Sequence, residues 1–446
     1  MLRERIYGAC VYVMACLAAI HLVITSVSLL QGGARSLVVA ALAIARPAGI
    51  LQAMMLLSFG VVSTIGITWT ICWVASLFYR TSPPKQLYRY PKLSVIVPAH
   101  NEERVIRNLL GDLRGQTYVN IEVLVVCHNC GDATDFQARV VASEDDRIRV
   151  LSLNTVESGK ALALNYGLRH ATGEFVFVFD ADNRLPENAI ERAATELTQE
   201  GVDAVQMSVW AWNSTGWLPK MQALESYLFL QAAWRGMSSL GIPCFLHGTG
   251  TGFRRSALER IGGWDNLLAE DYALLQKLLR RPERGRIVYV PDASCYDEKP
   301  TSWVGLFRQR ARWVRGHLQV ARRYAFRPSG VLIHDLLLFN PLHLYAWWVV
   351  ILGSLYGRLA EDPSLGVIWP LTGFAWLVSI AVTLVLTGAF ARQRWWQTVQ
   401  YFVFAFNYYW AAVFALRVRS WADAKTLHYG SLQSGAAGPS VGQLWR

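Results

Sequence analysis

Two carboxylates separated by a single alanine follow an apolar stretch in the sequence FVFVFDADN, residues 175–183. Alternating Phe and Val residues are typical of a buried β-strand, because both side chains suit a pleated, packed surface. Ligands of open α/β sheets bind beyond the carboxyl ends of the strands, where Asp180 and Asp182 would lie. Adjacent carboxylates repel each other unless a cation joins them, so the pattern indicates a hard divalent ion shared with substrate phosphates. A capped turn is the alternative interpretation, since Asp is a common turn residue.

The segments that must position these carboxylates follow a regular order. Strand-like stretches that begin at residues 93, 121, 147 and 175 each precede a polar turn and a helical pattern. Strands that alternate with helices indicate βαβ units and an α/β fold with a parallel, right-handedly connected sheet. GxGxxG does not follow the first strand, and GTGTG at 248–252 has a different spacing. The sequence therefore gives little support to a dinucleotide-dependent oxidoreductase.

Long and almost uncharged apolar stretches flank this mixed region. They are residues 7–30 and 49–79 before it, and residues near 336–357, 366–391 and 397–416 after it. The first two are each long enough to cross a bilayer. Lys and Arg residues gather before the first stretch and after the second, which marks these flanks and the domain between the spans as cytoplasmic. We therefore expect a multi-pass protein of the cell (inner or plasma) membrane with a cytoplasmic catalytic domain, and the side of the C-terminus stays open.

The net charge of +11 is compatible with nucleic acid binding, but cytoplasmic membrane flanks and a polyphosphate-bearing substrate explain it better. The sequence contains no RNA- or DNA-binding motif, so nucleic acid is not an expected partner. Cys127 and Cys130 form a single C-x-x-C pair, which cannot close a structural zinc site without a second pair. A redox or metal role for this pair is a minor alternative.

Four short motifs occur in a fixed order along the chain: PAHNEE from residue 98, DAD from 180, AED from 269 and QRARW from 309. In this order they resemble the motifs of glycosyltransferase family 2, in particular its membrane-embedded synthases of cellulose, hyaluronan, chitin and poly-N-acetylglucosamine. The resemblance covers about residues 92–325 and the pattern of flanking spans. It implies a GT-A (Rossmann-like) cytoplasmic domain inserted between transmembrane helices. It also implies transfer of a sugar from a nucleoside diphosphate to an acceptor hydroxyl.

The resemblance divides the chain into five parts. We expect two spans in residues 1–79, the GT-A catalytic domain in 80–300, and an amphipathic interface helix with QRARW in 301–330. Two or three further spans would follow in 331–420, and residues 421–446 would form a tail.

Residue roles follow from the same resemblance. Asp182 would ligate Mg²⁺ or Mn²⁺ on the diphosphate, and Asp271 would be the general base that takes the acceptor proton. A helix-dipole role is the alternative for an acid at this helix start. Arg312 would pair with the diphosphate, and Trp313 would offer an apolar face to the acceptor sugar. Further substrate contacts are expected from Glu270, Gln309 and Gly250, and nucleotide contacts from Ala99, Glu102, Asp132, Lys160 and Asp180.

Two histidines receive no such role. His128 stands where the family commonly has a base-reading Asp, which departs from the usual turn, and it either fills the turn or reads the base. His247 is expected to be a satisfied turn residue rather than a catalyst.

The expected function is an inverting, processive β-glycosyltransferase that moves sugar from a UDP-sugar, UDP-Glc or UDP-GlcNAc, to a growing polysaccharide and secretes it. Glycosylation of a lipid acceptor is the alternative within the same chemistry. A transporter with a degenerate cytoplasmic domain is the rival from another class, but polar residues are few within the apolar stretches. The sugar, the linkage and the oligomeric state do not follow from the residues.

Overall fold

The computed structural model describes residues 54–55, 57–58, 68–79, 87, 89–281, 283, 285–325 and 342–359, and residues 400, 401, 404, 407, 410, 411, 413 and 415. The expected spans 7–30 and 366–391 and the tail 421–446 lie outside these residues. The other three expected spans lie only partly within them. Within the described residues, no helix combines the length and the apolar character needed to cross a bilayer.

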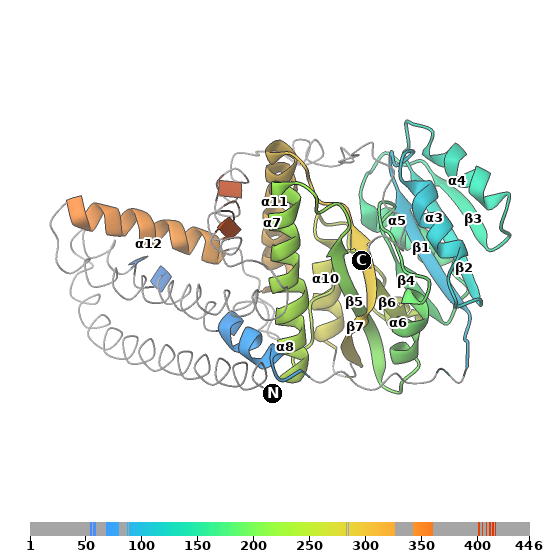
Figure 1. Cartoon of the computed structure of the whole chain (residues 1–446), viewed down its shortest axis with the longest axis horizontal. Coiled ribbons are helices and arrows are strands. Elements are labelled where there is room, and N and C mark those ends of the chain that lie inside the picture. Colours follow the sequence, from blue (N-terminus) through green and yellow to red (C-terminus); the bar gives the residue numbers. More distant parts are fainter. Residues whose placement is uncertain are drawn as a thin grey trace.

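The described part of the chain contains one seven-stranded sheet with the strand order β3-β2-β1-β4-β6-β5-β7 (Figure 1). Its strands are β1 (Leu93–Ala99), β2 (Ile121–His128), β3 (Ile148–Leu153), β4 (Phe175–Val178), β5 (Val202–Ala211), β6 (Thr251–Arg254) and β7 (Arg286–Asp297). The four strands predicted from the sequence are confirmed as β1 to β4. They pair in parallel, β3 with β2, β2 with β1, and β1 with β4.

The expectation of a parallel sheet holds for β1 to β4 but not for the whole sheet. β6 runs antiparallel to both β4 and β5, between which it lies. A long helical excursion separates β5 from β6, so the chain returns to the sheet in the opposite direction. Gly252 permits the tight fit in this position, because a Cβ there would lie 2.6 Å from the ring of Phe177.

Helices cover both faces of the sheet. On one face α3 (Ile106–Arg114), α4 (Thr134–Ala142) and α6 (Ala189–Leu197) enclose one apolar core. On the other face α5 (Lys160–His170), α7 (Trp217–Ser226), α8 (Ala233–Ser239), α10 (Glu270–Leu279) and α11 (Trp303–Val320) enclose a second. The remaining helical elements are the π-helices η1 (Tyr227–Ala232) and η2 (Ala321–Ala325), α9 (Arg255–Arg260) and α12 (Leu342–Leu359). Central strands are buried because both faces are covered.

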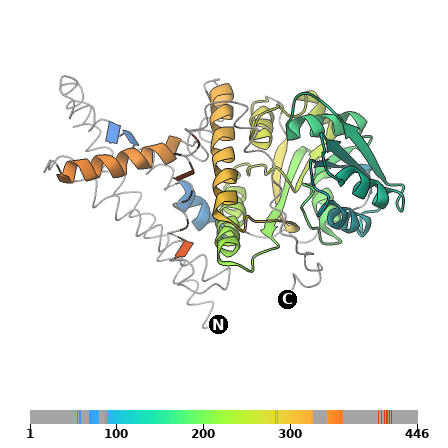
Figure 2. The same ribbon diagram turned by 90° about the horizontal axis from the view of Figure 1, so that it is seen from above.

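An N-terminal helical segment, residues 68–76, is docked onto the helices of the second face. A Cβ on Gly236 would lie 1.7 Å from the carbonyl oxygen of Cys72, so the two backbones are in direct contact. The indole nitrogen of Trp73 donates a hydrogen bond of 3.1 Å to the carbonyl oxygen of Leu228 in η1. Figures 1 and 2 both show α7, α8 and α11 between the sheet and α12.

Candidate active site

The first acidic pair lies at the carboxyl end of β4, as the sequence predicts. β4 ends at Val178, and the amide of Asp180 donates hydrogen bonds to Asn183 Oδ1 and Thr249 Oγ1, each at 3.0 Å. These bonds fix a tight turn in which Asp182 is half-buried. The turn therefore holds both carboxylates at the edge of the sheet where ligands of α/β folds bind.

Lys160, the first residue of α5, connects the two acidic pairs. Its Nζ lies 2.5 Å from Asp180 Oδ1 and 3.6 Å from Glu270 Oε1, and it donates a 2.6 Å hydrogen bond to the carbonyl oxygen of Gly248. The side chain of Lys160 is 12% exposed, so water screens these interactions only weakly. One buried cation thus joins the turn after β4, the loop before β6 and the start of α10.

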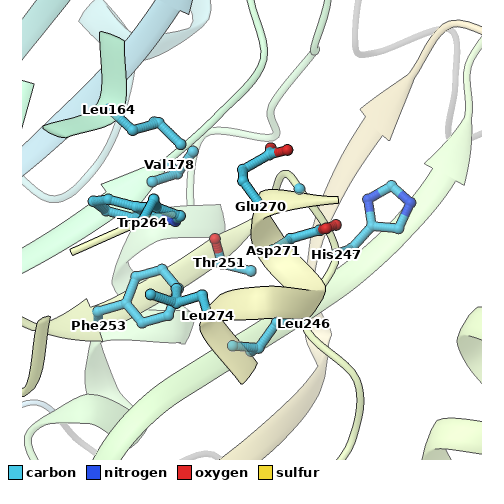
Figure 3. Close-up of a pocket in the computed structure, with 11 residues that line it drawn as sticks. Leu164, Val178, Leu246, His247, Thr251, Phe253, Trp264, Glu270, Asp271 and Leu274 are labelled. Atoms are coloured by element: carbon cyan, nitrogen blue, oxygen red, sulfur yellow. The ribbon is translucent and has the colours of Figure 1, made fainter. Parts of the chain in front are cut away.

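Glu270 and Asp271 are the first residues of α10 and line a pocket on the second face of the sheet (Figure 3). Their carboxylates point in different directions, and that of Asp271 is directed toward the ring of His247. Both acids lie close to Gly248, since a Cβ there would be 3.4 Å from Asp271 Oδ2 and 3.6 Å from Glu270 Oε1. The other lining residues are Leu164, Val178, Leu246, Thr251, Phe253, Trp264 and Leu274.

Burial is the main influence on the pKa values of Glu270 and Asp271, the second acidic pair. It raises the pKa of Glu270 to about 7. Lys160 opposes this rise, and the charge of Asp271 adds to it. Burial also raises the pKa of Asp271, against the effects of Lys160 and Arg312. A carboxylate whose pKa lies closer to neutrality is a stronger base, so the pair is suited to accept a proton.

The environment of Asp182 fits a divalent cation. Burial, and then the charges of Asp180, Asp297 and Glu298, raise the pKa of Asp182 to about 8. A positive ion would relieve this crowding, and carboxylate oxygens are the ligands that Mg²⁺ and Mn²⁺ prefer. Among the described residues, no group of three or more His, Cys, Asp or Glu side chains is arranged to hold a metal ion.

The expected nucleotide contacts Glu102 and Asp132 differ in their surroundings. Burial, followed by the charges of Asp182 and Asp180, raises the pKa of Glu102 to about 9, so Glu102 lies near the Asp-x-Asp turn. Asp132 instead accepts a 3.2 Å hydrogen bond from the amide of Glu103 through Oδ2. The structure therefore gives Asp132 a part in joining the turns after β1 and β2.

Ala99 and His128 end the neighbouring strands β1 and β2. The carbonyl oxygen of Ala99 accepts a 3.5 Å hydrogen bond from the thiol of Cys130. His128 is buried, and its Nε2 lies 2.9 Å from Thr155 Oγ1. Both residues help to build the turns beside Glu102, and their contact with a nucleotide stays a prediction.

The QRARW motif lies on α11, and the first of its two arginines, Arg310, is the buried one. Arg310 donates a 2.9 Å hydrogen bond to Glu225 Oε2 on α7, with side chains only 4% and 8% exposed. The guanidinium of Arg310 also covers one face of Trp313, 4.4 Å from the ring centroid. Gln309 and Arg312 are half-buried, and Arg312 lies near enough to Asp271 to oppose the rise in its pKa. The motif thus contributes both a structural ion pair and a positive charge near enough to the candidate base to act on its pKa.

Helix α11 also fixes the start of α10. A Cβ on Gly316 would lie 2.9 Å from the backbone nitrogen of Ala269, so the two backbones pack closely. Gln319 Oε1 accepts a 3.2 Å hydrogen bond from the amide of Leu268. The residues directly before Glu270 and Asp271 are therefore held by the helix that carries QRARW.

Gly250 does not line the pocket, although the sequence suggests a substrate contact for it. Its amide donates to Val178 and its carbonyl oxygen accepts from Met207, at 3.0 and 2.8 Å, so it lies buried between strands. Its φ of +63° and the 2.6 Å gap that a Cβ would leave to Cys295 Sγ both require glycine. Gly248, two residues earlier, is the glycine that lines the pocket.

A protein-family model described as glycosyltransferase like family 2 matches residues 91–316, just over half of the chain. This chain is a family 2 glycosyltransferase. The mixed α/β, GT-A-like fold also agrees with a mannosyltransferase from Pyrobaculum calidifontis, solved with GDP-Man and Mn²⁺. The two structures superpose with a TM-score of 0.53 at 22% identity, over 77% of this chain and 100% of that one. The resemblance to the family that the four motifs indicate is confirmed.

Relatives of this glycosyltransferase include proteins that are named for different products. The probable glycosyltransferase YdaM of Bacillus subtilis is 28% identical over 69% of this chain and 78% of its own length. The β-monoglucosyldiacylglycerol synthase of Trichormus variabilis is 26% identical over 77% of this chain and 74% of its own. The poly-β-1,6-N-acetyl-D-glucosamine synthase of Staphylococcus aureus is 27% identical over 58% and 63%, respectively.

Sequence reasoning missed two features of the glycosyltransferase site. Asp297 and Glu298, in the sequence YDEKP, lie near enough to Asp182 to raise its pKa. Their position beyond an apolar strand, like that of the Asp-x-Asp pair, is the signal that could have revealed them. The buried pair of Arg310 and Glu225 joins segments 85 residues apart, and no local pattern marks it.

Proposed function

We propose that this glycosyltransferase transfers a sugar from a UDP-sugar, UDP-Glc or UDP-GlcNAc, to an acceptor hydroxyl with inversion at the anomeric carbon. The observation that carries the proposal is the position of Lys160, which joins the donor-side acid Asp180 to Glu270, next to Asp271. A group that holds a diphosphate and a group that takes a proton must lie on opposite sides of one sugar. Lys160 lies between Asp180 and the start of α10, which carries Asp271.

In the proposed reaction, Asp182 would hold Mg²⁺ or Mn²⁺ on the donor diphosphate, and Asp180 would contact the ribose or support the metal. The cation, when bound, neutralises the charge that develops on the leaving diphosphate. Asp271 accepts the proton of the acceptor hydroxyl as its oxygen bonds to the anomeric carbon and the bond to the phosphate oxygen breaks. A single displacement on an α-linked donor gives a β-linked product. Arg312 adds positive charge beside the diphosphate, and Trp313 offers its ring to the acceptor sugar.

Hydrolysis or transfer of UDP-sugars by the purified protein tests this proposal. We expect turnover that EDTA abolishes and that added Mg²⁺ or Mn²⁺ restores. Full activity in EDTA would contradict the metal-binding role of Asp182. The absence of turnover with a panel of nucleotide sugars would contradict the reaction.

For the acceptor, we propose a growing polysaccharide that the enzyme extends processively and secretes. Support comes from the QRARW motif, from the resemblance to polysaccharide synthases, and from the relative that makes poly-N-acetylglucosamine. A lipid acceptor is the second candidate, because the β-monoglucosyldiacylglycerol synthase matches 77% of this chain against 58% for the polysaccharide enzyme. Reconstitution in vesicles with labelled donor separates the two. Long glycosidase-sensitive products support the polymer, and a single glycolipid on thin-layer plates supports the lipid.

We further propose a multi-pass location in the cell membrane with the catalytic domain in the cytoplasm. The apolar stretches and their basic flanks support it, as do exposed Trp217 and Trp303, whose rings pack 5.9 Å apart at one end of α7 and α11. Membrane fractions that resist carbonate extraction are the expected result. Protease accessibility of the catalytic domain only in inverted vesicles would support the orientation, and digestion in intact cells would contradict it.

A further inference from the structure

The loop before β6 holds a histidine in a fixed position beside the candidate base. The amide of His247 donates a 2.7 Å hydrogen bond to Gln206 Oε1, and Gln206 is fully buried. Gln206 Nε2 in turn donates to the carbonyl oxygens of Thr249 and Gly250, both at 3.2 Å. A single buried amide therefore sets the path of the loop, so the direction of the His247 side chain follows from the fold.

The imidazole of His247 has an unused polar atom in the pocket. His247 lines the same pocket as Glu270 and Asp271, and the carboxylate of Asp271 is directed toward its ring (Figure 3). Its Nδ1 is buried and finds no hydrogen-bond partner among the residues that the structure describes. A buried nitrogen without a partner costs free energy unless a ligand supplies the missing group. The sequence-based expectation of a satisfied turn residue is therefore wrong for this side chain.

The surrounding charges indicate which kind of ligand group would fit. Burial lowers the pKa of His247 to about 3, and the nearby cations Lys299, Lys160 and Arg310 contribute to this effect. Each of them is paired with a carboxylate: Lys160 with Asp180, Lys299 with Asp297, and Arg310 with Glu225. The imidazole therefore stays neutral, with one N–H and one lone pair. Such a group suits a neutral hydroxyl, which can donate or accept, better than a phosphate oxygen.

We propose that His247 binds the acceptor, by a hydrogen bond between Nδ1 and an acceptor hydroxyl, and orients the reacting hydroxyl toward Asp271. This inference rests on the proposed function. Because His247 lies on the side of the pocket to which the Asp271 carboxylate points, the bond forms with the acceptor and not with the donor diphosphate.

The test compares three substitutions at His247 with one control. His247→Phe keeps a planar ring without polar atoms, His247→Asn places an amide near the position of Nδ1, and His247→Gln places it near Nε2. His170→Phe is the control, because His170 lies at the far end of α5 and bonds to the carbonyl oxygen of Tyr166. Hydrolysis of UDP-Glc and UDP-GlcNAc without acceptor reports on the donor site. Transfer to cellotetraose, chitotetraose and dioleoylglycerol reports on the acceptor site.

His247→Phe should raise the acceptor KM about five- to tenfold, the effect of one lost hydrogen bond, and leave donor hydrolysis within about twofold of wild type. His247→Asn should recover most of the loss and His247→Gln little of it. An unchanged acceptor KM in His247→Phe, or an equal rise in the donor KM, would overturn the inference. If His247→Phe does not fold, the contrast between Asn and Gln decides, and equal acceptor KM values for the two would overturn it. Wild-type protein that neither hydrolyses nor transfers from these donors would overturn the proposed function, and the role of His247 with it.

Discussion

The ammonium nitrogen of Lys160 lies 2.5 Å from Asp180 Oδ1 and is almost buried. The same nitrogen lies 3.6 Å from Glu270 and lowers the pKa of Asp271, so a single cation acts on both acidic pairs. Because a general base must be ionised, this cation favours the active form of Asp271.

Replacement of Lys160 by Met should therefore impair catalysis most at low pH. Burial already raises the pKa of Asp271, so wild-type kcat/KM should fall as the pH drops through that raised value, above the usual range near 4 for Asp. Without the cation the pKa rises further, and the acidic limb of the pH–rate profile should move to higher pH. At neutral pH we expect kcat/KM to fall about ten- to a hundredfold, which corresponds to the free energy that a hydrogen bond to a charged group contributes.

Lys160→Arg is the matched control, because it keeps the charge. Its acidic limb should stay close to that of wild type. An unchanged limb in Lys160→Met would contradict an electrostatic role for this side chain.

The two acidic pairs should respond differently to substitution. Asp271→Asn should lower kcat about 10²- to 10⁴-fold, the usual contribution of a general base, while the Kd of the UDP-sugar stays near wild type. Asp182→Ala should weaken donor binding in the presence of Mg²⁺ or Mn²⁺ as well as turnover. Calorimetry with donor and metal, beside steady-state kinetics, separates these effects. Wild-type rates in both variants would show that the site lies elsewhere.

Gly316 should tolerate a side chain poorly, unlike a glycine in an open helix position. An added Cβ at Gly316 meets the backbone of Ala269 at 2.9 Å, so Gly316→Ala should lower the free energy of unfolding by about 1–3 kcal/mol and disturb the start of α10. Turnover should fall because Glu270 and Asp271 follow directly. Thermal unfolding and kcat measure the two effects.

Gly111 in α3 provides the matched control for that substitution. An added Cβ at Gly111 meets no atom within 4 Å, so Gly111→Ala should gain about 0.5–1 kcal/mol from helix propensity and leave kcat unchanged. Equal stability changes in the two variants would contradict the close packing of α11 on α10.

The ion pair of Arg310 and Glu225 should matter more for folding than an exposed arginine of the same helix. Arg310→Met removes the cation that pairs with the buried carboxylate of Glu225 and should cost about 3–5 kcal/mol. The double variant with Glu225→Leu should recover most of this loss, since an apolar pair avoids the buried charge. Arg308→Met, at an exposed position of the same helix, should change stability by less than about 0.5 kcal/mol. Chemical denaturation of wild type, Arg310→Met, Glu225→Leu and the double variant gives the coupling free energy, and additive effects would contradict a direct interaction.

The sequence by itself determined the parts of the protein that depend on local patterns. Apolar alternation before Asp180 marks β4, and the same kind of pattern marks β1, β2 and β3. Side-chain type and spacing suffice there, because β1, β2 and β4 are buried and each of the four strands is followed by a polar turn. The order of PAHNEE, DAD, AED and QRARW likewise indicates the family, which the family model confirms.

Only the tertiary structure decided which side chains meet. Lys160, Asp180 and Glu270 come from three separate elements, and their contact depends on the antiparallel return of β6, which the sequence did not predict. Arg310 is buried and Arg312 is half-buried, although the two lie only two residues apart in the motif. Helical periodicity turns Arg310 toward α7 and leaves Arg312 near Asp271. The buried Nδ1 of His247 likewise has no hydrogen-bond partner among the described residues, because of the path that the loop before β6 takes. Partner and burial are properties of the folded surroundings, and residue type alone does not fix them.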